Sequence, residues 1–430
     1  MSTTLTEIAS KARLEPKTVF TSLAHLLTPE YFKDNWRQMN KAAAKGIDGE
    51  TMEAFGNNLD ARIEDLVARL KAGNYKAPLI RRVDIPKGNG KTRPLGITTV
   101  EDRLVQRAVA GILGTIFEQD FMDVSHGYRP GRGPHGALRA LRSQIISGKV
   151  RHVYEADIRG YFTAINHDWV RKMVRQRIAD KTILKLIDKW LKAGVMFNGV
   201  VTQPESGTPQ GGPISCILAN LYLHFVLDLW FEKVFKRRCK GEAYITRFVD
   251  DFVCCFQHRE DAEMFDRELS ARMKKFDLEL APEKTRMLQF GRFARENMSR
   301  KGLKTETFTF LGFEHVCGID GKGKFTLIRI PGKKSCRKFL DRTKEWLSKH
   351  IHWRRVDQRV QLSLMLIGFY RYFGLYHCKS KLDCIHYEVK RQWRRAIKRQ
   401  GQRTKAHWSY LQSKSWFSLP YANTCLHPTV

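Results

Sequence analysis

Two adjacent carboxylates, Asp250 and Asp251, lie between two short apolar runs of this sequence, at residues 244–249 and 252–256. Apolar runs on either side of a polar pair are typical of two strands joined by a turn. Two like charges in a buried hairpin are unfavourable unless a cation neutralises them. Mg²⁺ is a hard ion that prefers oxygen ligands and keeps positions open for phosphate, so the pair is a candidate metal site. The alternative is a solvated Asp-Asp turn without a function.

A third carboxylate, Asp157, ends another predicted strand at residues 152–158. A strand-end Asp together with a hairpin Asp pair supplies the ligands of a two-metal site. In such a site one ion activates an attacking oxygen and the other stabilises a leaving pyrophosphate. A purely structural Asp at the strand end fits the spacing equally well.

The segment 80–97 predicts a β-hairpin, because alternating residues flank the turn Gly88-Asn89-Gly90. Lys87 and Arg93 lie on either side of this turn, where two cations can hold a triphosphate. The alternative is a solvated basic hairpin.

The formal net charge of the 430-residue chain is +32, which favours a polyanionic partner over a small metabolite. Residues 331–430 hold 22 Lys and Arg against 5 Asp and Glu. The nine cysteines include no CxxC pair, which predicts free thiols in a reducing compartment. We find no apolar run of membrane-spanning length and no signal-peptide core. We therefore expect a soluble cytoplasmic protein that contacts no membrane, with association with the bacterial nucleoid left open.

Two basic regions are candidate contacts for nucleic acid. Arg129 and Arg132 belong to a turn rich in Gly and Pro. Further along, residues 382–397 predict a helix with one apolar face. The opposite side of this helix is basic and holds hardly any acidic residues, which favours nucleic-acid contact over a solvated surface. These cations are Lys390, Arg391, Arg394, Arg395, Lys398 and Arg399.

Nine segments of the chain, taken in order, resemble the reverse transcriptases of group II introns. Residues 127–132 (GYRPGR) are similar to a GFRPGR block, residues 207–215 to a TPQGGPLS-type motif, and residues 248–251 occupy the place of YADD. The other matching segments are 45–49, 85–97, 157–162, 282–285, 310–313 and 366–373.

The resemblance implies an α+β fold of the right-hand polymerase type. It places a helical N-terminal extension at 1–45, fingers at 46–150, a palm with an antiparallel sheet at 151–325, and a basic helical thumb, or maturase domain, at 326–430. No HNH-type Cys/His cluster follows the thumb segment in this sequence, so we expect no endonuclease domain.

The resemblance also assigns roles to residues. Asp157, Asp250 and Asp251 are implied as catalytic metal ligands for Mg²⁺ or Mn²⁺, assisted by the carbonyl group of Ile158. Phe162 is implied as a steric gate that excludes a 2′-hydroxyl and so selects dNTPs. The remaining implied contacts of the dNTP are Lys87, Arg93, Gln210 and Lys284.

The implied activity is RNA-directed DNA polymerisation. Its partners are an RNA template (with DNA as a second template), a DNA primer, dNTPs and a structured intron RNA in a maturase role. Two alternatives stay open: a free-standing relative with a host role in DNA repair, phage defence or CRISPR spacer acquisition, and an RNA-binding splicing cofactor without polymerase activity. Phe248 and Val249 depart from the usual Tyr-Ala, which predicts altered handling of the primer.

Overall fold

Helices form the N-terminal part of the chain, and threonines at their first turns explain where several of them begin. The computed structural model describes residues 4–88, 91–208 and 211–422. Thr4, Thr28 and Thr51 each accept a hydrogen bond from a backbone N–H of the first helical turn, which otherwise lacks an acceptor. The helices are α1 (Leu5–Leu14), α2 (Pro29–Arg37), α3 (Met52–Gly56) and α4 (Leu59–Lys71).

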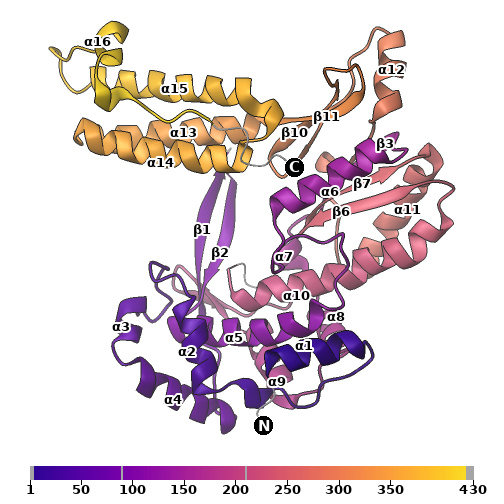
Figure 1. Cartoon of the computed structure of the whole chain (residues 1–430). Helices are drawn as coiled ribbons and strands as arrows, with labels where there is room; N and C mark the ends of the chain where they lie inside the picture. Colours follow the sequence, from indigo (N-terminus) through magenta and orange to yellow (C-terminus); the bar gives the residue numbers. More distant parts are fainter. Residues whose placement is uncertain (1–3, 89–90, 209–210, 423–430) are drawn as a thin grey trace.

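The predicted hairpin at residues 80–97 is confirmed. Strand β1 (Ile80–Gly88) pairs in antiparallel register with β2 (Lys91–Ile97), so that Val83 lies opposite Leu95. The short strands β4 (Val195–Phe197) and β5 (Val200–Thr202) complete a sheet of order β2-β1-β4-β5. In Figure 1 the hairpin extends from the N-terminal helices toward the C-terminal helices.

Two apolar helices, α5 (Val100–Phe117) and α10 (Pro213–Leu223), pack against each other in the first hydrophobic core. Helix α10 continues through the π-helical turns η2 (His224–Asp228) and η3 (Phe231–Phe235) into the 3-10 turn η4 (Lys236–Arg238). The resulting helix, Pro213–Arg238, is long and apolar enough to cross a membrane, so the expectation that no such run exists was wrong. Its most apolar window is 83% buried inside the protein, as in a core helix.

A four-stranded sheet, which we call the palm sheet because it lies in the segment that the resemblance assigns to the palm, has the order β6-β7-β3-β8, and every neighbouring pair is antiparallel. Its strands are β3 (His152–Asp157), β6 (Ala243–Phe248), β7 (Asp251–Phe256) and β8 (Arg286–Gln289). Helix α11 (Arg259–Lys275) packs on this sheet, where the ring of Phe265 contacts those of Phe256 and Tyr154. In the chain, helix α6 (Pro134–Ser147) precedes β3, and three helices follow it: α7 (Tyr161–Ala164), α8 (His167–Val174) and α9 (Lys181–Leu191).

The C-terminal part of the chain is helical beyond residue 332, as the sequence predicted. A three-stranded sheet of order β11-β10-β9 precedes it, with strands β9 (Phe308–Phe310), β10 (Phe313–Ile319) and β11 (Phe325–Pro331). The helices beyond the sheet are α13 (Lys333–Lys349), α14 (Arg355–Phe373), α15 (Lys379–Lys398) and α16 (Trp408–Gln412), and one further helix, α12 (Arg292–Arg300), lies before the sheet in the chain. The predicted apolar face of α15 is buried, and its Trp393 donates a hydrogen bond of 2.8 Å to Gln358 of α14.

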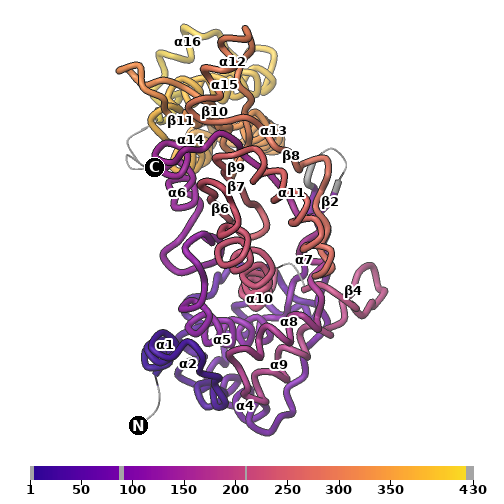
Figure 2. The backbone as a smooth tube through the Cα atoms, turned by 90° about the vertical axis from the view of Figure 1, so that its right-hand side faces the viewer, coloured from indigo at the N-terminus to yellow at the C-terminus, as the bar shows by residue number. Residues whose placement is uncertain are grey.

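The hydrophobic residues form two cores that meet along the palm sheet. The first joins the N-terminal helices, α10, α11 and one face of the sheet, and the second joins α6, the other face and the C-terminal helices. Figure 2 shows the N-terminal and C-terminal helices at opposite ends of the molecule, with the palm between them. The predicted α+β class is confirmed, and the eight cysteines in the described part of the chain are free thiols, as expected.

Candidate functional site

Three carboxylates meet where strands β3 and β7 end side by side. Asp157 is the last residue of β3 and lies directly opposite Asp251, the first residue of β7. Residues opposite each other in an antiparallel pair point to the same face with Cβ atoms about 5 Å apart. Asp250 occupies the turn between β6 and β7, next to this pair. We call these three residues, which the sequence indicated as candidate metal ligands, the carboxylate edge.

A buried ion pair holds the turn that carries Asp250. The guanidinium group of Arg247 donates hydrogen bonds of 2.8 and 2.5 Å to the two carboxylate oxygens of Asp228, and both side chains are completely buried. The same guanidinium donates a bond of 2.9 Å to the carbonyl oxygen of Val249. Val249 has a φ of +60°, an unfavourable conformation for a β-branched residue. The ion pair therefore stabilises a strained turn beside the carboxylates.

Gly127 leaves room for this turn. A Cβ atom at residue 127 would lie 2.5 Å from Cγ2 of Val249 and 2.7 Å from its backbone nitrogen. The carbonyl oxygen of Gly127 accepts a bond of 2.6 Å from Asn220 of α10. The GYRPGR segment and the core helix thus support the Asp-bearing turn from one side.

Burial raises the pKa of two of these carboxylates, and repulsion by the neighbouring carboxylates adds to the shift. Burial, with smaller contributions from Asp250 and Asp157, raises the pKa of Asp251 to about 7. Burial and Asp157 also raise the pKa of Asp250, while Arg93 and Lys284 partly oppose that shift. Negative charge concentrated in this way favours a bound cation.

Lys284 supplies a cation from the protein itself. Its ammonium group forms an ion pair with Asp157, and this contact raises the pKa of Lys284. Within residues 4–88, 91–208 and 211–422, no group of three or more His, Cys, Asp or Glu side chains is arranged to hold a metal ion as it stands. The three carboxylates offer the hard oxygen atoms that Mg²⁺ and Mn²⁺ prefer, and the ion pair to Lys284 must open for Asp157 to bind such an ion.

The loop before α10 contacts the region of α7 on one side and strand β2 on the other. Backbone N–H groups of Gly207 and Thr208 donate bonds of 2.7 Å to the carbonyl oxygens of Ile165 and Phe162. Phe162 lies in the first turn of α7, five residues after Asp157, and its side chain is 4% exposed. On the other side of the loop, a Cβ atom at Gly211 would lie 2.6 Å from the carbonyl oxygen of Gly96 in β2.

The structure describes some of the other predicted contacts of the metal and the dNTP, and not others. Arg93 is an exposed residue of β2 close enough to Asp250 to lower its pKa. Ile158 directly follows Asp157 and has a buried side chain. Gln210 and the side chain of Lys87 lie outside the described residues.

One predicted nucleic-acid contact is wrong. The guanidinium group of Arg129 is 2% exposed and forms an ion pair of 2.8 Å with Glu118. It also donates bonds to three backbone carbonyl oxygens of residues 121–125, so it holds the structure of its own loop. Arg132 pairs with Asp123 at 2.5 Å and remains partly exposed.

The basic side of α15 is partly covered by the segment that follows it. Lys390 lies 5.1 Å from the ring centre of Phe417, and Arg394 lies 5.2 Å from that of Trp408. Arg391 pairs with Glu388 on its own helix. The exposed cations of the predicted set are therefore Arg395, Lys398 and Arg399.

Sequence reasoning missed two features beside the carboxylates. Tyr128 has a φ of +53°, is 55% exposed, and is near enough to Asp250 and Arg93 for their charges to affect its pKa. The second missed feature is Asp228. The sequence could have indicated it, because it is the one acidic residue within the apolar run 214–231.

Comparisons with known proteins give a consistent result. Residues 85–315 match the family described as reverse transcriptase (RNA-dependent DNA polymerase). The group II intron-encoded protein LtrA of Lactococcus lactis subsp. cremoris is 41% identical over 220 residues, which are 49% of this chain and 36% of that protein. Protein YkfC of Escherichia coli is 36% identical over 225 residues, which are 51% of this chain and 59% of that protein.

A more distant relative is the mitochondrial nuclear intron maturase 1 of Arabidopsis thaliana, which is 33% identical over 92 residues, 21% of this chain and 13% of that protein. The matches to LtrA and YkfC span between about a third and three-fifths of the length of those proteins.

Proposed function

Because the chain belongs to the reverse transcriptase (RNA-dependent DNA polymerase) family and is of the group II intron type, we propose that it copies RNA into DNA. The family match confirms the resemblance and the right-hand polymerase fold expected from the sequence. In the proposed reaction the 3′-hydroxyl group of a DNA primer attacks the α-phosphorus of a dNTP and releases pyrophosphate. DNA is a second template in this proposal.

The observation that carries the proposal is the pairing of Asp157 with Asp251, with Asp250 in the adjoining turn. These carboxylates, with the carbonyl oxygen of Ile158, would hold Mg²⁺ or Mn²⁺. When bound, such ions polarise the α-phosphate and stabilise negative charge on the attacking and leaving oxygens. Lys284, released from Asp157, remains beside the phosphates as a mobile cation.

The incoming nucleotide would lie between the palm and the fingers. Arg93 and Lys87 come from the hairpin that extends from the fingers and would bind the triphosphate. Phe162 would lie under the sugar and exclude a 2′-hydroxyl group, and Gln210 would contact the sugar and the template strand. The loop supports the last assignment, since residue 208 bonds to Phe162 and residue 211 touches β2.

Template and primer would extend from the carboxylate edge along the thumb. We place the functional regions at 1–45, 46–150, 151–325 and 326–430, as the resemblance implies. A second function, binding of structured intron RNA as a maturase, is favoured by the exposed cations Arg395, Lys398 and Arg399, because no ion pair is recorded for them in the described part of the chain.

Primer extension by the purified protein tests the proposal. Wild-type protein with Mg²⁺ is expected to extend a DNA primer on an RNA template with dNTPs, and the Asp250→Ala/Asp251→Ala variant is expected to lose this activity. The matched control is Asp266→Ala, which removes a carboxylate that accepts a bond from Tyr154 on the far side of the sheet. Absence of extension on every template, with RNA binding retained, would refute the polymerase and leave the maturase proposal standing.

A further inference from the structure

A second concentration of positive charge lies away from the carboxylate edge. Helix α12, the β10–β11 hairpin and the end of α6 enclose a hollow of about 1050 Å³, which we call the α12 hollow. Its lining cations are Arg142, Arg292, Arg295, Arg300 and Lys324, and its carboxylates are Glu296 and Asp320. Figure 1 shows α12 at the outer side of the molecule, far from the β1–β2 hairpin.

The positive charges of the α12 hollow outnumber its two carboxylates, Glu296 and Asp320. No ion pair is recorded for its five cations within the described residues. One carboxylate oxygen of Asp320 accepts hydrogen bonds of 2.9 Å from the backbone N–H groups of both Lys322 and Lys324. Asp320 therefore stabilises the β10–β11 turn. Surface cations of a folded protein are usually interspersed with acidic residues, so this excess favours an anionic ligand.

Burial is costly for two guanidinium groups of this region, those of Arg295 and Arg329. Atom Nη1 of Arg295 is shielded from solvent and has no hydrogen-bond acceptor in the described part of the chain. Arg329 of β11 is 3% exposed, and burial together with the nearby charge of Arg142 lowers its pKa to about 10. A shielded donor without an acceptor is costly, and so are two close cations. An anion bound in the hollow, which both Arg295 and Arg142 line, would relieve both costs.

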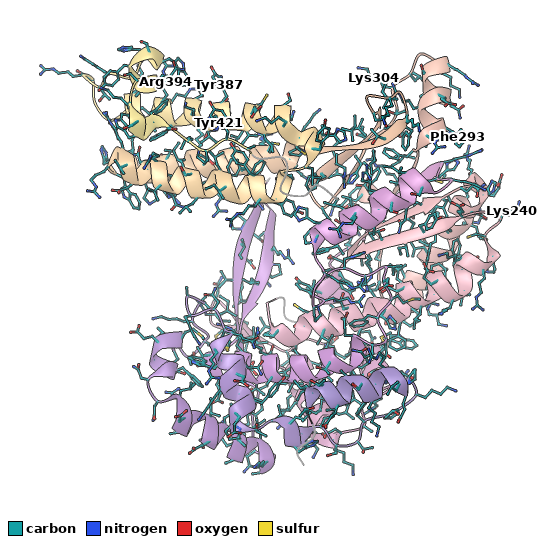
Figure 3. All side chains as sticks on the ribbon, viewed as in Figure 1. Lys240, Phe293, Lys304, Tyr387, Arg394 and Tyr421 are labelled. Atoms are coloured by element: carbon teal, nitrogen blue, oxygen red, sulfur yellow. The ribbon has the colours of Figure 1, made fainter. Side chains whose placement is uncertain are left out.

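An aromatic ring accompanies the cations. Phe293 of α12 is 37% exposed, and its ring lies 4.6 Å from the guanidinium group of Arg151. Lys301 and Lys304 are exposed residues that follow α12 directly. Figure 3 labels Phe293 and Lys304 beside α12, at the side of the molecule opposite the α15–α16 region. Cations together with an exposed aromatic ring are the combination that binds single-stranded nucleic acid through its phosphates and bases.

We propose that the α12 hollow binds the phosphodiester backbone of a nucleic-acid strand at a place separate from the carboxylate edge. The five cations come from three elements around a hollow of about 1050 Å³, which fits successive phosphates of a strand better than one small anion. The strand is either RNA or DNA, since both carry the same backbone. This binding is independent of DNA synthesis, because none of its residues belongs to the carboxylate edge.

The test compares two triple variants that lose the same charge. Arg292→Gln/Arg295→Gln/Arg300→Gln changes the α12 hollow, and the control Lys181→Gln/Lys185→Gln/Lys192→Gln removes three exposed lysines at and just beyond α9. The probe is a labelled single strand of about 16 nucleotides, as RNA and as DNA of the same sequence. Fluorescence anisotropy is measured over a range of salt concentrations, with an unlabelled primer–template duplex in excess to occupy the carboxylate edge.

The α12 variant is expected to bind the probe at least about tenfold more weakly than the control. The slope of log K against log salt should fall by about 2, since each lost phosphate contact on a single strand contributes about 0.7. Extension of a short duplex primer should match that of the control, which shows that the variant is folded. Equal probe affinity for the two triple variants, or a loss of short-primer extension in the α12 variant alone, would overturn the proposal.

Discussion

Substitution of Arg247, which holds the turn that carries Asp250, should reduce both protein stability and catalysis. In Arg247→Met the carboxylate of Asp228 stays completely buried without its partner. Loss of one member of a buried ion pair costs about 3–5 kcal/mol. The carbonyl oxygen of Val249 also loses the donor at 2.9 Å that fixes the turn next to Asp250. We therefore expect a large fall in thermal stability together with a fall in the rate of extension.

The double variant Arg247→Met/Asp228→Leu distinguishes the two effects. An apolar pair of similar size replaces the buried charges, and such replacements are often neutral or stabilising. Thermal stability should therefore return close to that of the wild type. The anchor on Val249 is still missing, so the turn stays misplaced, and a displacement of about 1 Å at a reacting group can cost about 100-fold in rate.

Scanning fluorimetry and single-turnover primer extension measure the two quantities. The exposed ion pair of Arg238 with Glu268 provides the control, since Arg238→Met should cost less than about 1 kcal/mol and leave extension unchanged. A double variant at residues 247 and 228 that recovers both its stability and its rate would refute the positioning role of Arg247.

Three further predictions concern other parts of the structure. Lys284→Ala frees Asp157 from its ion pair, so half-maximal extension should need less Mg²⁺ while the maximal rate falls; a higher Mg²⁺ requirement would contradict this. Gly127→Ala should abolish extension, and Val249→Ala should not rescue it, because the added Cβ still lies 2.7 Å from the backbone nitrogen of residue 249. Burial raises the pKa of Asp102 to about 6, so its favourable contribution to stability is present below about pH 4 and is lost as the pH rises through about 6. The difference in thermal midpoint between the wild type and Asp102→Asn should decrease over that range, and a constant difference would argue against the shift.

The carboxylate edge could be predicted because its geometry follows from local rules. Apolar runs around Asp250 and Asp251 specify a hairpin, and Asp157 ends a strand with the same pattern. The antiparallel pairing of β3 with β7 then brings the three together, and the sequence did not specify that pairing.

Burial explains where sequence reasoning failed. Arg129 looked like a surface cation in a basic turn, but its partner Glu118 lies eleven residues earlier at the end of α5, and no local pattern links them. Lys390 and Arg394 lie on the polar side of α15, where the rings of Phe417 and Trp408 fold back over them. Long-range contacts of this kind decide exposure, and spacing along the chain carries no information about them.

The central claim is that the carboxylate edge holds the divalent ions of a polymerase, and counting bound Mn²⁺ by electron paramagnetic resonance tests it most directly. With a primer–template duplex and a non-reacting dNTP analogue, the wild type should bind about two Mn²⁺ ions per chain. Asp157→Asn should lose this binding while it retains the duplex. Equal Mn²⁺ binding by the wild type and Asp157→Asn would contradict the account.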